Sequence, residues 1–189
     1  MTIKNVFRWS PMYDLAKLII FIDMDGVIAR WNEKASEEET HQKLYFLNRE
    51  PEESSVELIK KLQKAGFLLC FLSSVYIDDH SIFEKNTWLD QRGFENIPRI
   101  FVPYGESKSD YIPKGKHILI DDYSKNLMQW IEAGGIAIKF FNGINNRPKL
   151  TIVDGVVEVK LDGWTGYSID YRMTPQQMAT IVSAVANAA

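Results

Sequence analysis

Five short apolar segments along the chain constrain the fold more than any other feature of the sequence. They are Leu18–Ile22, Phe67–Leu72, Arg99–Val102, Ile118–Ile120 and Ile136–Phe140. Segments of this length suit β-strands that are buried on both faces, as the strands of parallel sheets are. Helical patterns lie between them, and strands that alternate with helices predict right-handed crossovers. The sequence therefore predicts an α/β fold with a doubly wound, mostly parallel sheet.

Start and stop signals place the helices between these strands. Ser54 and Glu57 form a capping-box pattern that predicts a helix start, and Gly66 stands where that helix should end. A later helix is expected to start at Ser124 and to end at the glycines after residue 133. Its buried residues are expected to be Leu127, Met128 and Ile131.

Two regions depart from the alternation of strands and helices. Residues 32–50 are rich in Glu and are predicted to form a small helical cap insertion over the edge of the sheet. Residues 1–31 and 51–189 are predicted to form the α/β core. The core should end in a hairpin around Asp154-Gly155, followed by a helix that Thr174-Pro175 opens.

Composition excludes several classes of partner. A net charge of −3 and a pI near 5.7 argue against a nucleic-acid polymer but allow a local pocket for one phosphate. No apolar segment approaches the roughly 18–20 residues that span a bilayer, and the N-terminus lacks a signal-peptide core, so we expect a cytoplasmic protein. The single cysteine, Cys70, is expected in the core. The oligomeric state stays open, a homodimer included.

Polar side chains follow the apolar segments at the points where strands should end. They are Asp23 and Asp25 after the first segment, Ser73 and Ser74 after the second, and Asp121 and Asp122 after the fourth. Lys108 lies in the loop before the fourth segment. Ligands of open α/β sheets bind beyond the carboxyl ends of the strands. These residues therefore predict one site for a phosphate and a hard cation.

Each residue type has a role in phosphoryl transfer. The carboxylate of Asp23 can attack phosphorus and form an aspartyl-phosphate. Asp25, two residues on in an extended segment, projects to the same side and can act as general acid and base. Mg²⁺ joins clustered carboxylates, and Asp121 or Asp122 would complete its ligands. Ser73 and Lys108 are the candidates for holding the phosphoryl oxygens.

Other readings of the same residues remain open. Asp-x-Asp-Gly also occurs in calcium loops and in ordinary polar turns, although the further ligands of a calcium loop are missing here. Ser73-Ser74 could cap a helix, and Lys108 could be one of several solvated lysines. The three histidines are scattered without the spacing of a zinc site.

The ordered set Asp23-Met24-Asp25-Gly26, Phe71-Leu72-Ser73-Ser74, Lys108 and Ile120-Asp121-Asp122 resembles the haloacid dehalogenase (HAD) superfamily of phosphatases. The likeness spans roughly residues 18 to 140. Within that superfamily the chain is similar to the 5′(3′)-deoxyribonucleotidase family, through Glu84-Lys85-Asn86-Thr87-Trp88-Leu89 as well as the first and last motifs. The resemblance implies a HAD-like Rossmann-type core with a small cap and a Mg²⁺-dependent nucleotidase activity.

The resemblance also implies ligand and substrate contacts. Mg²⁺ would be held by Asp23, the backbone carbonyl of Asp25 and one acid of the Asp121-Asp122 pair, with Asp122 preferred. Lys85 would add a second positive charge near the phosphate. The aromatic residues that would sandwich a nucleobase are Trp31, Tyr45 and Phe46. Aromatic residues in such positions can equally pack a cap onto its core.

Three functions are compatible with these residues. The leading one is hydrolysis of small (deoxy)nucleoside monophosphates, and the nearest alternative is hydrolysis of sugar phosphates or other small phosphometabolites by the same chemistry. A phospho-accepting signalling receiver also uses acids, a Ser or Thr and a Lys on a doubly wound sheet. A receiver would carry its acidic pair first, whereas here Asp-x-Asp comes first and the acidic pair last.

Overall fold

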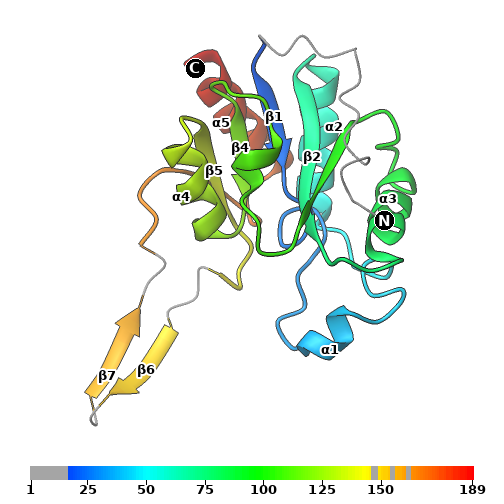
Figure 1. The fold of residues 1–189 in the computed structure, drawn as a ribbon. Helices are drawn as coiled ribbons and strands as arrows, with labels where there is room; N and C mark the ends of the chain where they lie inside the picture. The colour runs from blue at the N-terminus through cyan, green and yellow to red at the C-terminus, as the bar shows by residue number, and fades with distance from the viewer. Residues whose placement is uncertain (1–16, 146–148, 154–155, 161–162) are drawn as a thin grey trace.

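A six-stranded parallel sheet forms the centre of the molecule (Figure 1). The computed structural model describes residues 17–145, 149–153, 156–160 and 163–189. The sheet consists of β1 (Ile19–Ile22), β2 (Leu68–Val75), β3 (Arg99–Pro103), β4 (Ile118–Asp121), β5 (Ile136–Phe141) and β8 (Tyr167–Asp170). The strand order is β3-β2-β1-β4-β5-β8, and every neighbouring pair is parallel.

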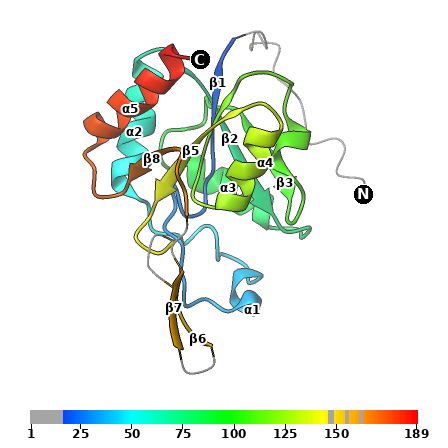
Figure 2. The same ribbon diagram turned by 90° about the vertical axis from the view of Figure 1, so that its left-hand side faces the viewer.

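Helices cover both faces of this sheet, as Figures 1 and 2 show. The helices of the described residues, α1 beyond the end of the sheet included, are α1 (Glu37–Thr40), α2 (Glu53–Lys64), α3 (Ser81–Asp90), the 3₁₀ helix η2 (Lys108–Tyr111), α4 (Ser124–Glu132) and α5 (Pro175–Asn187). Helices α2 and α5 lie side by side on one face, and α4 lies on the other (Figure 2). The predicted doubly wound α/β fold is therefore confirmed.

The side chains of the central strand explain why both faces are covered. Ile20 and Ile22 of β1 point into a core that α2, α3 and α5 close, whereas Ile19 and Phe21 point into the core under α4. Alternate strand residues project to opposite faces, so a strand that is apolar at every position needs helices on both sides. Cys70 is buried in the second of these cores as predicted, and burial raises the pKa of its thiol to about 12.

Two details of the helices differ from the predictions. Helix α2 begins at Glu53 with Glu52 as its N-cap, so Ser54 lies inside the first turn and the predicted capping box is wrong. The reason lies just before the helix. The backbone of Glu52 donates to Ile28 O at 2.8 Å, which keeps the chain extended up to that residue. Gly66 follows the helix with φ of 85°, as its predicted role as a stop requires.

The buried face of α4 also differs from the prediction. Leu127 is buried as expected, but Met128 and Ile131 are 51% and 44% exposed, and Trp130 is buried instead. The indole nitrogen of Trp130 donates to His117 O at 3.0 Å, and its ring packs edge-on against Phe21. The large indole surface thus determines which face of the helix meets the sheet.

The C-terminal region contains one predicted and one unpredicted feature. Strands β6 (Lys149–Val153) and β7 (Val156–Lys160) form the predicted antiparallel hairpin, although its turn at residues 154–155 lies outside the described residues. The hairpin extends away from the sheet in both views (Figures 1 and 2). The chain then returns as β8, an unpredicted strand that pairs with β5. Thr174 caps α5 through the expected capping box.

The cap segment contains little regular structure. Helix α1 has four residues and starts at a capping box formed by Ser36 and Glu39. It lies at the lower end of the molecule in Figure 1, beyond the end of the sheet. Within the described ranges, no helix is both long and apolar enough to cross a membrane.

Candidate active site

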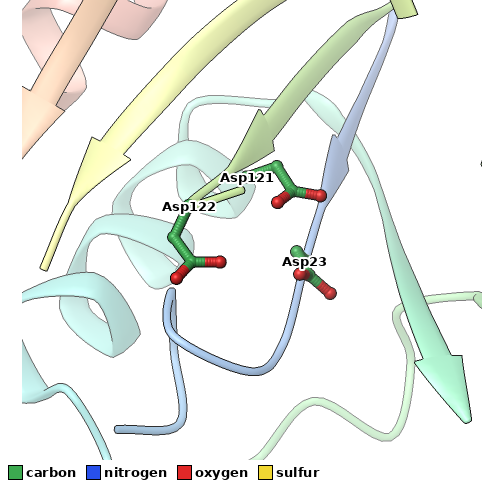
Figure 3. A group of neighbouring side chains, drawn as sticks. All are labelled: Asp23, Asp121 and Asp122. Carbon is green, nitrogen blue, oxygen red and sulfur yellow. The ribbon is translucent and has the colours of Figure 1, made fainter. Parts of the chain in front are cut away.

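Parallel pairing of β1 with β4 brings the first and last acidic motifs together. Ile22 pairs with Ile120, and the backbone N–H of Asp23 continues the ladder by donating to Ile120 O at 2.9 Å. Asp23 and Asp121 therefore leave the two central strands at the same level. Figure 3 shows their carboxyl groups beside that of Asp122.

These three aspartates form an acidic cluster at the carboxyl edge of the sheet. One carboxylate oxygen from each of Asp23, Asp121 and Asp122 lies within 4.8 Å of the others. No other group of three or more His, Cys, Asp or Glu side chains in the described part of the chain has this spacing. Clustered carboxylate oxygens suit a hard cation such as Mg²⁺. The donor set therefore fits the predicted metal.

Lys108 supplies the positive charge nearest to the acidic cluster. It lies at the start of η2, and its side chain is buried. Its ammonium group donates to Asp121 Oδ2 at 2.7 Å and lies 2.9 Å from Asp23 Oδ1. Burial disfavours the charge of Lys108, but the carboxylates of Asp121 and Asp23 outweigh it and raise the pKa. Lys108 thus stays protonated beside the predicted nucleophile.

The side chain of Asp121 is occupied by protein partners. Its Oδ2 accepts from Lys108 and, at 2.9 Å, from the side-chain amide of Asn126. Its Oδ1 accepts from the backbone N–H of Tyr123 at 2.8 Å. Both oxygens of this carboxylate are therefore engaged.

Asp122 has a different environment, provided by the loop that follows β5. Its Oδ2 accepts from the side-chain amide of Asn142 at 2.8 Å and, more weakly, from that of Asn145 at 3.4 Å. Gly26, with φ of 78°, lies against this carboxylate so closely that a Cβ at that position would collide with it. The glycine of the first motif therefore makes room for the second acid of the last motif.

The electrostatics of the cluster favour a bound cation. Burial, together with the charges of Asp121 and Asp23, raises the pKa of Asp122 well above its usual range. Burial also raises the pKa of Asp121, although Lys108 opposes the shift. Lys108 and Lys139 oppose the shift at Asp122 without cancelling it, and a divalent cation would stabilise the ionised forms of the three carboxyl groups.

Asp25 is held by a second buried lysine. Lys85 of α3 is fully buried, and its ammonium group donates to Asp25 Oδ2, to Ser73 Oγ at 3.0 Å and to Ser74 O at 2.7 Å. The other oxygen of Asp25, Oδ1, is buried and has no hydrogen-bond partner among the described residues. Burial raises the pKa of Asp25, and the Lys85 charge opposes that shift. Asp25 thus offers one free oxygen to a ligand.

Helix α3 also fixes the cap segment above this acid. The buried carboxylate of Glu84 accepts from the backbone N–H groups of Leu44 at 2.6 Å and Phe46 at 3.1 Å. Leu44 has φ of 70°, which is unusual for a residue with a side chain, and the two hydrogen bonds stabilise it. The buried ring of Phe46 lies 4.5 Å from Lys85 Nζ. Phe46 therefore packs the cap onto the site.

The three residues predicted to stack on a base do not border a common pocket. Tyr45 lies edge-on to Phe46 and borders a cap pocket of about 290 Å³. Trp31 is 38% exposed and borders another pocket, of about 260 Å³, together with Tyr171 and Asn142. The hydroxyl of Tyr45 is buried and has no hydrogen-bond partner in the described ranges.

Sequence reasoning missed several residues that touch the predicted site. They are Glu84, Asn126, Asn142 and Asn145. Asn142 directly follows β5, but it is the second residue after the predicted segment Ile136–Phe140, so only inspection of the first two residues after that segment would have identified it. No comparable signal marks Asn126, which lies within a helix.

Known proteins resemble this chain in fold. No protein-family model matches it, and no curated protein matches its sequence. The structure of D,D-heptose 1,7-bisphosphate phosphatase from B. bronchiseptica, described as complexed with magnesium and phosphate, aligns with a TM-score of 0.56 and 13% identity. The alignment covers 91% of this chain and 99% of that one.

Two further solved structures align over most of the chain. An uncharacterized protein from Listeria monocytogenes serotype 4b has a TM-score of 0.54 and 13% identity, over 88% of this chain and 99% of that one. A HAD-superfamily hydrolase from Ehrlichia chaffeensis aligns less closely, with a TM-score of 0.48 and 11% identity over 89% and 97%. The first two likenesses confirm the predicted Rossmann-like α/β architecture.

Proposed function

We propose that this chain is a Mg²⁺-dependent phosphohydrolase of the HAD type that acts on small phosphate monoesters through an aspartyl-phosphate on Asp23. The observation that carries the proposal is the convergence of Asp23, Lys108 and the Asp121-Asp122 pair at the ends of β1 and β4. Asp25 lies beside this group with one carboxylate oxygen free. The magnesium and phosphate named for the fold neighbour from B. bronchiseptica support the same chemistry.

The protein residues divide the reaction into two displacements. In the first, a carboxylate oxygen of Asp23 attacks phosphorus, the bond from phosphorus to the leaving oxygen breaks, and Asp25 gives its proton to that oxygen. In the second, water attacks the phosphorus of the aspartyl-phosphate while Asp25 takes the water proton. Inorganic phosphate leaves, and Asp23 regains its carboxylate. The free Oδ1 of Asp25 is our candidate for both proton transfers.

Asp23, the backbone carbonyl of Asp25 and Asp122 are our candidates to hold Mg²⁺. Asp122 is preferred over Asp121 because both oxygens of Asp121 already accept hydrogen bonds from Lys108, Tyr123 and Asn126. When bound, Mg²⁺ would neutralise charge on the phosphoryl oxygens.

Lys108 and Ser73 are the candidates to bind the phosphoryl group. Lys108 touches Asp23, so its charge lies where an aspartyl-phosphate would form. We assign Lys85 to the positioning of Asp25, because its three protons are directed at Asp25, Ser73 and the carbonyl of Ser74. A direct contact of Lys85 or Ser74 with substrate stays a prediction from the resemblance.

The proposed substrate is a (deoxy)nucleoside monophosphate. Cap aromatics near Asp25 support it, because the Phe46 ring lies against Lys85, the lysine that holds Asp25, and Tyr45 packs edge-on against Phe46. A sugar phosphate is the second candidate, favoured by the heptose bisphosphate named for the fold neighbour. The carboxyl groups of Asp23 and Asp25 would act on either substrate in the same way. The two substrates differ in the contacts that their leaving groups would make with the protein.

A phosphate-release screen tests the proposal. Purified protein is assayed with Mg²⁺ on nucleoside 5′- and 3′-monophosphates, their deoxy forms and a panel of sugar phosphates. We expect Asp23→Asn to abolish turnover and Asp25→Asn to lower kcat by about 10²–10⁴-fold, the range of general acid–base catalysis. Near-normal activity in either variant contradicts the mechanism.

The metal is tested in the same assay. A chelator should stop the reaction and added Mg²⁺ should restore it. Ca²⁺ should inhibit, because its looser and larger coordination disturbs in-line transfer. Full activity in chelator contradicts the metal assignment.

A further inference from the structure

We propose that Asn142 and Asn145, in the loop after β5, form an amide clamp that positions Asp122 as a metal ligand. The inference rests on the proposed function, since it concerns the Mg²⁺ site described there. It assigns a positioning role to two residues that lie outside the motifs of the sequence and beyond the five predicted strands.

The side-chain amide of Asn142 joins two distant parts of the site. Its Nδ2 donates to Asp122 Oδ2 at 2.8 Å and to Gly26 O at 3.1 Å, across 116 residues of sequence in the second case. Asn142 therefore ties the loop of the first motif to the acid of the last. Both protons of the amide nitrogen are used in this way.

The orientation of this amide is fixed from its other end. Asn142 Oδ1 accepts from the backbone N–H groups of Ile144 and Asn145, each at 3.0 Å. An amide flipped by 180° would point its NH₂ at two N–H donors and its oxygen at two acceptors. The tight turn of residues 142–145 thus determines which end of the amide faces Asp122.

Asn145 completes the clamp from the same turn. Its Nδ2 donates to the backbone carbonyl of Asp122 at 2.7 Å and to Phe140 O at 3.2 Å, and it lies 3.4 Å from Asp122 Oδ2. It therefore holds the backbone of Asp122 against the end of β5, while Asn142 holds the carboxylate. Main chain and side chain of the same residue are fixed together.

The clamp leaves the other oxygen of Asp122 for a ligand. Oδ1 accepts no hydrogen bond from the described part of the chain, whereas Oδ2 accepts from the two amides. Asp122 is oriented by neutral amide donors and forms no ion pair with a lysine among the described residues, unlike Asp121, which is paired with Lys108. Residues that orient a ligand in this way typically contribute about 10–100-fold to metal affinity.

Calorimetric titration of Mg²⁺ into the full-length protein, without substrate, tests the clamp. We expect Asn142→Leu to raise the Kd for Mg²⁺ by about 10–100-fold, with Asn145→Leu acting in the same direction. Asn126→Leu is the matched variant, because it removes an amide from Asp121, and its effect should be smaller. Asn187→Leu, at the exposed end of α5, controls for the loss of an asparagine as such.

A second measurement separates positioning from folding. Thermal unfolding without Mg²⁺ reports the stability of each variant, and the two clamp variants give independent tests should one unfold. In the folded variants, kcat should recover toward the wild-type value at saturating Mg²⁺, with KM for substrate little changed.

The outcomes distinguish the clamp from the proposed function. Wild-type Mg²⁺ affinity in both folded clamp variants overturns the clamp and leaves the phosphatase proposal standing. Weakened Mg²⁺ affinity in a protein that hydrolyses none of the screened phosphate esters supports the clamp and contradicts the function. A wild-type protein that binds neither Mg²⁺ nor Mn²⁺ overturns the clamp, whatever it hydrolyses.

Discussion

Asp121 and Asp122 are neighbours in sequence, yet their side chains have different partners. Asp121 faces Lys108 and the start of α4, whereas Asp122 faces the loop after β5. The sequence predicts that one acid of the pair holds the metal but cannot identify it, since the deciding donors include Lys108, 13 residues before Asp121, and Asn145, 23 residues after Asp122. Position in a folded loop therefore distinguishes two chemically identical side chains.

Lys85 gives a prediction at the scale of single residues. Lys85→Met and Lys85→Gln remove the donor that holds Asp25, so protonation of the leaving group should fail. We expect kcat on an alkyl phosphate such as a nucleotide to fall about 10²-fold, the cost typical of a misplaced catalytic group. The fall should be much smaller on p-nitrophenyl phosphate, whose leaving group needs little protonation. Steady-state kinetics on both substrates measure the difference.

The alternative role of Lys85 has a different kinetic signature. A lysine that binds the phosphate directly would raise KM equally for both substrates when it is replaced, and equal effects would contradict the positioning role. Lys60→Met is the matched control, because Lys60 is half-exposed and pairs with Glu57 on the surface of α2.

At the scale of elements, the sheet carries a buried histidine just before β4, close to the start of β1. His117 Nδ1 accepts from the backbone N–H of Ile19 at 3.3 Å, while Nε2 is buried without a partner in the described residues. Burial lowers the pKa of His117. The neutral ring is thus the form that the native structure accommodates.

This burial predicts how stability depends on pH. The unfolded chain binds a proton at His117 below pH of about 6.5, whereas the native protein resists it to lower pH. The contribution of the neutral His117 ring to the free energy of unfolding is therefore fully present above that pH. It is lost as the pH falls through the pKa of His117 in the native protein. Denaturant unfolding between pH 7.5 and 5 should show a smaller pH dependence for His117→Gln than for wild type or for His41→Gln on the exposed cap. Equal pH dependence of the free energy of unfolding in wild type and His117→Gln would contradict a buried, neutral His117.

The strands and helices could be predicted from the sequence where the hydrophobic period and the length of a segment indicate the same type of element. Five apolar segments became five strands, because each is buried from both sides. The sixth strand, β8, was missed because its four residues include Ser168 and Asp170 and lie at the sheet edge. The buried face of α4 was misjudged because Met128 and Trp130 are both apolar; the larger indole surface of Trp130 and its hydrogen bond to His117 O place Trp130 against the sheet.

At the scale of the whole molecule, two pockets are candidates for binding the leaving group of the proposed substrate. Tyr45 borders the cap pocket and Trp31 the pocket near Tyr171. We expect Tyr45→Ala to lower kcat/KM for a nucleotide about 5–150-fold, which corresponds to roughly 1–3 kcal/mol for one stacked base. The effect on a sugar phosphate should be small, and Trp31→Ala should have less effect than Tyr45→Ala on both.

Competition assays with both substrates in one mixture measure these ratios directly. If Trp31→Ala lowered kcat/KM more than Tyr45→Ala, the leaving group would be assigned to the pocket near Tyr171 instead. Unchanged ratios in both variants would mean that base stacking does not determine specificity.

The candidate site was predictable to the extent that it follows strand ends. Asp23, Asp121 and Lys108 converge because parallel strands finish at one edge. The amide donors on Asp122 were not predicted, since asparagines are common in loops and only the turn at residues 142–145 aims them. The roles of Trp31 and Tyr45 were not separable either, because nothing in the sequence shows that they border different pockets.

The pairing of β1 with β4, and the amide of Asn142 on Gly26, also have a consequence for folding kinetics. Both contacts join segments about a hundred residues or more apart, and such long-range contacts form late because the intervening chain must first be ordered. Helices such as α2 can form early from local interactions, but the acidic cluster exists only after the two central strands have met. Chains in which β1 and β4 have not yet paired therefore lack the acidic cluster, and the proposed activity requires these long-range contacts to have formed.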